Sequence, residues 1–184
     1  MRHRGKLTYM AIYSSAAYPI VVLKVYEYYY GLDLVAVERI IPLVDYAFLP
    51  EAPHFILGVV QYHGLPLPLV SLRRRFGLPD GRPALSDHIV LAATPRRRVA
   101  LLADEVCGFE EVPATAWQSA ESLNPAGTGS ISSVATVRQR LVLIHDIEKC
   151  LSAEDDAALA AALRAPHAPA PVYGERPATG GGDD

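Results

Sequence analysis

Residues that could carry out chemistry are few in this chain and far apart. Cys107 and His145 are of the types that form a nucleophile–base pair, but nothing in the sequence places them together. The chain contains no Gly-x-Ser-x-Gly, Gly-x-x-x-x-Gly-Lys-Ser/Thr or His-Glu-x-x-His sequence. These are the signatures of a serine hydrolase, a phosphate-binding loop and a zinc protease. We therefore expect a protein without catalytic activity.

Charged residues gather at four places and suggest binding rather than catalysis. Asp104–Glu105 and Glu110–Glu111 form an acidic cluster that could hold a hard cation or could be a solvated face. Arg73–Arg75 and Arg96–Arg98 are the basic runs, and on a β-barrel they could follow a phosphate backbone. The net charge of −3 argues against polyanion binding by bulk charge. We expect no nucleic-acid partner, but a nucleic-acid-binding β-barrel remains the alternative function.

The two cysteines, Cys107 and Cys150, lack the spacing of a metal site. They are expected to be small buried hydrophobic residues in a reducing compartment, with no metal and no cofactor. The N-terminus imitates a secretory signal, because six residues that include basic side chains precede an uncharged stretch over 7–23. Polar residues dilute that stretch, so we expect a partly disordered extension over residues 1–18 of a cytoplasmic protein. An exported β-domain with a cleaved N-terminus is a further alternative.

Short apolar runs rich in β-branched residues and tyrosine predict roughly eight to ten strands. A bend near Tyr26–Glu27 would split the first run into a hairpin. Pro66 and Pro68 lack the amide donor of a strand ladder, so their strand should be an edge or bulged. The run Leu141–Ile144 is expected to be buried on both faces. The expected strand regions are Pro19–Leu34, Val35–Ile41, Pro53–Val60, Leu65–Leu72, His88–Ala93, Val99–Asp104, Ile131–Val137 and Leu141–Asp146.

One helix is predicted at the end of the folded region. Ser152 is a candidate N-cap with Asp155 three residues later, and Ala153–Arg164 is rich in alanine. Leu159 and Leu163, one turn apart, are its expected apolar anchors. Residues 165–184 are rich in proline and glycine and are expected to be disordered. The folded domain should therefore span residues 19–164 and be mainly β, with a small barrel, a sandwich and a pair of barrels as the alternatives.

Several segments resemble one known family. From Tyr30 the chain reads YGLDLVAVERI and then LPEAPHFILGVVQYHGLPLPLVSLRRRFGL, which is similar to the CheW-like coupling domain of bacterial chemosensory systems. HIVLAATPRRRVALLADEVCGFEEVP and RLVLIHDIEKCL resemble later segments of the same family, in the same order. The resemblance covers about Pro19 to Leu163. It implies two small SH3-like five-stranded β-barrels packed together, with a C-terminal helix.

The resemblance also implies a function. It is that of a non-catalytic adaptor, which couples the cytoplasmic tip of a chemoreceptor to the regulatory domain of a CheA-type histidine kinase. The pathway would be chemotaxis or a related one such as type IV pilus control, and the receptor would be the link to the membrane. The candidate partner-binding residues are Val37, Arg39, Gly58, Val59, Gln61, Tyr62, His63, Gly64, Ser71 and Arg73.

Four polar positions depart from the family pattern while the apolar positions are kept. Arg39 stands where the family has glutamate, Gln61 where it has asparagine, His63 where it has arginine and Ser71 where it has aspartate. If Arg39 and His63 lay on neighbouring strands, an attractive pair of the family would be lost. Because exposed ion pairs contribute only about 0–1 kcal/mol, the fold should survive this change, whereas partner choice need not.

Overall fold

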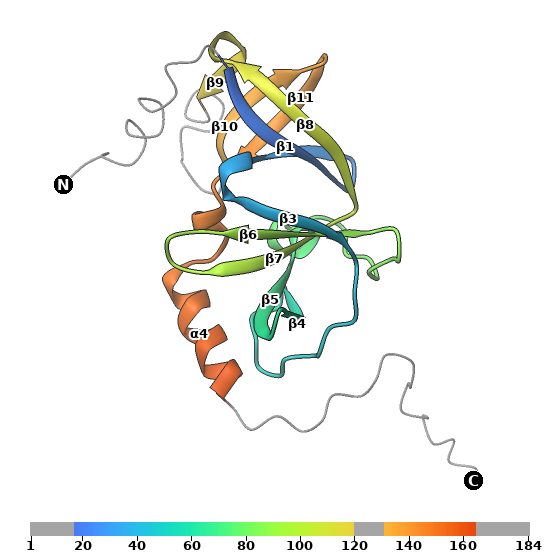
Figure 1. Cartoon of the computed structure of the whole chain (residues 1–184), viewed down its shortest axis with the longest axis vertical. Helices are drawn as coiled ribbons and strands as arrows, with labels where there is room; N and C mark the ends of the chain where they lie inside the picture. Colours follow the sequence, from blue (N-terminus) through green and yellow to red (C-terminus); the bar gives the residue numbers. More distant parts are fainter. Residues whose placement is uncertain (1–16, 120–130, 165–184) are drawn as a thin grey trace, which may run out of the picture.

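The strands form two sheets in the computed structural model, which describes residues 17–119 and 131–164 (Figure 1). The first sheet lies above the second in this view. Its strands, in spatial order, are β8 (Glu105–Pro113), β1 (Ala17–Val25), β2 (Tyr28–Asp33), β11 (Arg140–His145), β10 (Ile131–Val137) and β9 (Trp117–Ser119). The order in the second sheet is β3 (Val37–Pro42), β6 (His88–Ala93), β7 (Arg98–Ala103), β5 (Leu65–Ser71) and β4 (Ile56–Tyr62).

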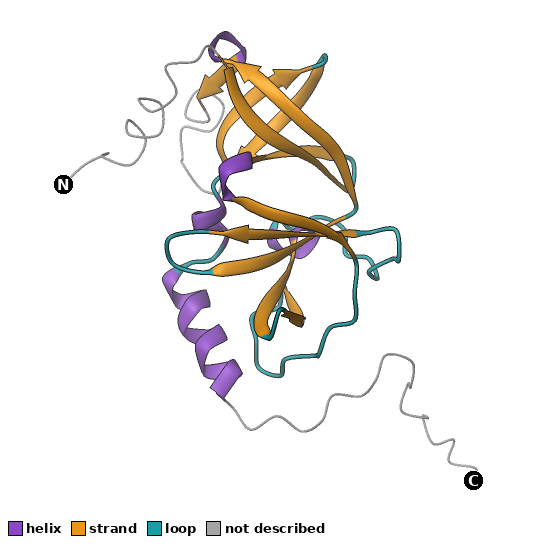
Figure 2. Ribbon diagram, viewed as in Figure 1, coloured by secondary structure: helices purple, strands orange, loops and turns teal. Residues whose placement is uncertain are grey.

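Helical structure is short except at the end of the described chain (Figure 2). The short elements are η1 (Leu34–Ala36), α2 (Leu72–Arg75), η2 (Ala114–Ala116) and η3 (Ile147–Cys150), and the long one is α4 (Ala153–Arg164). None of the helices in residues 17–119 and 131–164 is long and apolar enough to cross a membrane. The expected fold class, mainly β with two barrel-like halves and a C-terminal helix, is confirmed. The first sheet has one strand more than expected, because β9 adds to β10.

Tight turns join the hairpins, as the sequence indicates. Tyr26 has a φ of 58° in the turn between β1 and β2, where the predicted bend is confirmed. His63 and Gly64 have φ values of 48° and 78° between β4 and β5. Arg138 and Gln139 have positive φ values between β10 and β11. Positive φ at both central residues matches the right-handed twist of the flanking strands, so these two turns fix the strand register.

Three apolar clusters hold the sheets together, and strand parity distributes side chains among them. On β7, Ala100 and Leu102 point into the core of the second sheet, whereas Val99 and Leu101 point toward the first sheet. On β1, Ile20 lies in the core of the first sheet and Leu23 in the cluster between the sheets. Strands buried on both faces read as continuous apolar runs, which is why these segments lack a polar alternation. The cluster between the sheets, termed the shared core below, is the largest.

The proline-containing strand β5 is an edge over only part of its length. It pairs with β4 along nearly all of its residues, but with β7 only from Leu69 to Ser71. Pro66 and Pro68 precede that second pairing. Their missing amide donors therefore cost no ladder bond to β7, and the expectation of an edge is correct for this half of the strand alone.

Three expectations about burial are wrong. Leu141 is 60% exposed, so the run Leu141–Ile144 is not buried on both faces throughout. Cys107 lies on the exposed side of β8, and of the two cysteines only Cys150 is buried. In α4 the buried residues are Leu159 and Ala162, while Leu163 is exposed. The helix therefore faces the shared core through an i, i+3 pair, and the larger side chain one turn further on points to solvent.

The start of α4 has the predicted cap. The Asp155 amide donates to Ser152 Oγ at 3.1 Å, and the Ser152 amide donates to the Asp155 carboxylate at 2.8 Å. This reciprocal pair satisfies two amide donors at the helix start.

Replacement of Leu159 by alanine is expected to destabilise the protein by about 2–3 kcal/mol, because it leaves a cavity where the helix meets the shared core. Replacement of Leu163 by alanine is the matched control and should change the free energy of unfolding by less than about 0.5 kcal/mol. Urea denaturation of the two variants measures both values. Equal losses would mean that α4 packs through a different face.

Candidate partner-binding surface

The possible catalytic pair is not assembled. Cys107 lies on the exposed side of β8, whereas His145 is buried at the end of β11, and β1 and β2 separate the two strands in the sheet. Burial and the nearby Glu105 carboxylate raise the pKa of the Cys107 thiol, which disfavours the nucleophilic thiolate. The His145 ring stacks on Phe76 at 4.1 Å between ring centroids. These surroundings suit a structural histidine.

The acidic cluster is divided among separate ion pairs. Asp104 accepts hydrogen bonds from Arg73, and Glu110 pairs with Arg138 at 2.8 Å. The described residues contain no group of three or more His, Cys, Asp or Glu side chains that could hold a metal ion. The geometry thus gives Asp104 and Glu110 a structural use.

The first basic run forms the short helix α2, where each arginine binds a different segment. Arg73 donates through Nε at 2.8 Å and Nη2 at 2.6 Å to the Asp104 carboxylate. Arg74 Nε lies 3.0 Å from Asp80 Oδ2, and Arg74 Nη1 donates to the His54 carbonyl at 3.2 Å. The hydrogen bond with the Asp104 carboxylate is the main cause that raises the pKa of Arg73 above its ordinary value.

Arg75 completes α2 by donating through Nε to the carbonyl of Cys150 at 2.5 Å. Its guanidinium also lies over the Phe55 ring, 5.2 Å from the centroid. All three arginines of the first run are thus engaged within the chain.

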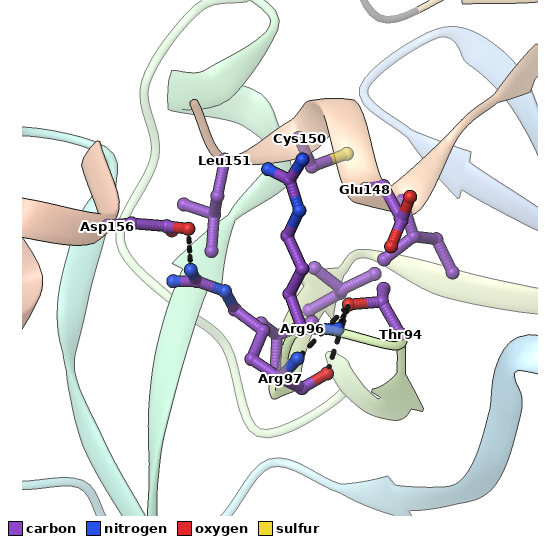
Figure 3. Close-up of a pocket in the computed structure, with 10 residues that line it drawn as sticks. Thr94, Arg96, Arg97, Glu148, Cys150, Leu151 and Asp156 are labelled. Carbon is purple, nitrogen blue, oxygen red and sulfur yellow. Dashed lines mark hydrogen bonds and ion pairs between the residues drawn. The ribbon is translucent and has the colours of Figure 1, made fainter. Parts of the chain in front are cut away.

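The second basic run is engaged at two of its three positions. Arg98 Nε donates to Glu38 of β3 at 2.9 Å, and Arg97 forms an ion pair with Asp156 of α4. Figure 3 shows Arg97 reaching Asp156 across a small pocket, while Arg96 extends along the same pocket toward Cys150. The pocket has space for about one water molecule, roughly 10 Å³. The Arg96 side chain forms no hydrogen bond or ion pair with the described residues.

Four candidate residues lie together on the β4–β5 hairpin. Gln61 and His63 are exposed, and His63 and Gly64 form the turn. Tyr62 is half-buried against the core of the second sheet, with its ring 4.3 Å from the His63 ring. The hairpin therefore has a polar tip, and the Tyr62 ring packs between this tip and the core of the second sheet.

Three candidates have structural roles of their own. A Cβ at Gly58 would lie 2.1 Å from the carbonyl oxygen of Ala47, and Val59 exchanges two backbone hydrogen bonds with Ala47 at 2.7 and 2.9 Å. Ser71 is 5% exposed, and its Oγ accepts from the Arg74 amide at the start of α2. Partner binding by Gly58, Val59, Ser71 and the engaged Arg73 stays a prediction.

Val37 and Arg39 lie on β3, the opposite edge of the second sheet from β4. Val37 is half-buried against the shared core, and Arg39 is exposed. Within the described residues, the Arg39 side chain forms no hydrogen bond or ion pair. Arg39 and His63 are therefore not on neighbouring strands, and the guanidinium of Arg39 is available to a partner.

Several apolar side chains of the described residues are exposed, and two of them lie next to residues of the shared core. Phe109 of β8 is 60% exposed and Val35 of η1 is 64% exposed. Phe109 is opposite Val21 in the ladder, on the face that turns toward the shared core. The sequence pattern does not predict β8, because the charged residues of this strand obscure its alternation. Exposure alternates along this strand, and Glu105, Cys107, Phe109 and Glu111 are more exposed than the residues between them.

Comparisons with known proteins agree with this architecture. The model of the CheW-like domain family matches residues 19–155. The chemotaxis protein CheW of Klebsiella aerogenes is 25% identical over 133 residues, which cover 68% of this chain and 76% of that protein. The chemotaxis protein CheW of Rhizobium meliloti is 29% identical over 87 residues, 47% of this chain and only 56% of the length of that relative.

A solved structure has the same fold. The scaffolding protein TtCheW from Thermoanaerobacter tengcongensis superposes with a TM-score of 0.65 and 22% sequence identity, over 71% of this chain and 89% of that chain. The family match spans strands of both sheets and most of the described residues. The chain belongs to the CheW-like domain family.

Proposed function

We propose that this protein is a non-catalytic chemotaxis scaffold, which couples the cytoplasmic tip of a chemoreceptor to the regulatory domain of a CheA-type histidine kinase. It works in the cytoplasm and associates with the membrane through the receptor alone. The observation that carries the proposal is the family match over residues 19–155, which includes strands of both sheets. The scattered positions of the possible catalytic residues favour binding over chemistry.

Two kinds of surface are suited to protein partners. Exposed Phe109 and Val35 offer apolar contact area beside the shared core, where an apolar stripe of a helical receptor could pack. The polar tip of the β4–β5 hairpin and the guanidinium of Arg39 offer hydrogen bonds and charge. Apolar area supplies affinity, whereas exposed charges set specificity and the association rate.

The alternative of nucleic-acid binding finds little support in the same geometry. Five of the six arginines in the two basic runs bind carboxylates or carbonyl groups within the chain. Arg96 alone retains a guanidinium without such a partner among the described residues. Filter binding at two salt concentrations is expected to show no steep salt dependence, because few counterions would be released.

Titration calorimetry against the regulatory domain of a CheA-type kinase from the same genome tests the proposal. We expect a dissociation constant in the micromolar range or tighter, on the order of −8 kcal/mol of binding free energy. A cooperatively folded protein that binds neither the kinase domain nor a receptor fragment would contradict the proposed function.

Charge reversal at Arg39 tests the contribution of β3. Arg39→Glu should change the dissociation constant for the kinase domain or the receptor about 10-fold through electrostatic mismatch. The melting temperature should change little, because the Arg39 side chain is exposed and forms no hydrogen bond or ion pair within the described residues. Arg82→Glu, another exposed arginine outside the candidate surface, is the control. An equal loss of stability and of binding in Arg39→Glu would argue against a surface role.

A further inference from the structure

The chain passes between the two sheets at three places. It leaves the first sheet through η1 between β2 and β3, and it returns through the single residue Asp104 between β7 and β8. After β11 it runs through η3 to α4, which packs on the shared core. Two arginines of α2 bind two of these connections. Arg73 binds Asp104, and Arg75 binds η3.

The first contact joins three segments at Asp104. The carboxylate accepts hydrogen bonds from both Nε and Nη2 of Arg73, and another from the Tyr26 amide at 2.6 Å. The Asp104 amide in turn donates to the Lys24 carbonyl at 3.2 Å. The residue between the sheets is therefore bound on one side to α2 of the second sheet and on the other to the β1–β2 turn of the first.

The second contact holds the passage from β11 to α4. Arg75 donates to the carbonyls of Cys150 and Lys149 in η3, at 2.5 and 3.4 Å. Arg74 differs from its two neighbours, because it binds Asp80 and the His54 carbonyl, which belong to loops of the second sheet's half of the chain. Arg73 and Arg75 thus make contacts between the two halves of the molecule, whereas Arg74 makes contacts within one half.

We propose that Arg73 and Arg75 are positioning residues that set the angle between the two sheets, and thereby preform the surface that the partners bind. This rests on the proposed function. Apolar contacts in the shared core are non-directional and tolerate small sliding movements. The bidentate guanidinium–carboxylate pair and the carbonyl contacts are directional, so they select one angle among those that the apolar core permits. A binding surface that both sheets form has the highest affinity for a partner when the sheets already have the bound orientation, because no free energy is then spent on reorienting them.

The measurement is the distance between the sheets. Spin labels are placed at Gln61 on β4 and Thr136 on β10, both exposed, in a protein that carries Cys107→Ser, and pulsed electron paramagnetic resonance gives the distance distribution. The variants Arg73→Met and Arg75→Met are compared with Arg74→Met, the matched control on the same helix. Binding of the kinase regulatory domain is measured by calorimetry on the same variants without labels.

We expect broader or shifted distance distributions in Arg73→Met and Arg75→Met, and an unchanged one in Arg74→Met. The dissociation constant should rise about 10-fold in the first two and stay within about 2-fold in the control, since only the first two lose preorganisation. If Arg73→Met does not fold, Arg73→Lys, which keeps the charge but not the bidentate geometry, should still broaden the distribution. Distributions that superpose in all variants overturn the inference. If the unaltered protein binds no kinase domain, the proposed function fails, and the distance measurement alone then decides whether the two arginines set the angle.

Discussion

Replacement of Gly58 by alanine should destabilise the protein by about 3 kcal/mol, because the added methyl group meets backbone rather than a movable side chain. The Cβ would lie 2.1 Å from the carbonyl oxygen of Ala47 and 2.9 Å from its carbonyl carbon. Ala47 is held there by its two hydrogen bonds with Val59, so the loop must move away and lose both of them. Urea denaturation of the variant gives the change directly.

Gly64→Ala is the matched control for the same added methyl group. At Gly64 nothing lies within 4 Å of the position of a Cβ, and the cost comes only from the φ of 78°. A non-glycine residue in this region costs about 1 kcal/mol. If Gly58→Ala costs no more than Gly64→Ala, the loop around Ala47 is not fixed on β4 and the edge of that strand is free.

The contact between Gly58 and the Ala47 segment determines how much of the β4 edge is accessible. The segment around Ala47 covers the outer edge of β4, which would otherwise offer unpaired amides to any passing strand. The edge of β4 is therefore already paired here, and the exposed part of this hairpin is its tip at His63. The close approach of the Ala47 backbone accounts for the glycine at this position.

The sequence predicts local features well and contacts between distant segments poorly. The turn at Tyr26–Glu27 and the cap at Ser152 depend on neighbours within three residues, and both are confirmed. The contact between Arg73 and Asp104 joins residues 31 positions apart, and no pattern near either of them indicates it. The basic runs therefore suggest a surface, although most of their charges are used inside the fold.

The assignment of faces is limited in the same way. Leu159 and Leu163 are equivalent in a helical pattern, and only the position of α4 on the shared core decides that the first is buried and the second exposed. For the candidate surface, the exposed positions of Arg39 and His63 agree with the sequence prediction, whereas the burial of Ser71 depends on the packing of α2.

Acidification from pH 6.5 to pH 4 should destabilise the protein by about 3 kcal/mol through His145 alone. The side chain is 5% exposed and stacks on Phe76. Burial is the main cause that lowers the pKa of His145 to about 4, and the charge of Arg75 lowers it further. The unfolded chain has the ordinary pKa of about 6.5, so between these two values the unfolded state binds more protons than the folded state. Stability is therefore full above pH 6.5 and is lost as the pH falls to 4.

Denaturation curves at pH 7, 6, 5 and 4 measure this dependence. His145→Phe keeps an aromatic ring beside Phe76 and removes the titrating group, so its stability should change little between pH 7 and pH 5, before the carboxyl groups titrate. The difference between the two proteins isolates the histidine from those carboxyl groups. Nuclear magnetic resonance of the imidazole ring gives the folded pKa independently. A His145 pKa near 6.5 would mean that the imidazole ring is solvated. The His145 ring would then not be packed on Phe76, and Arg75 would not lie close enough to lower its pKa.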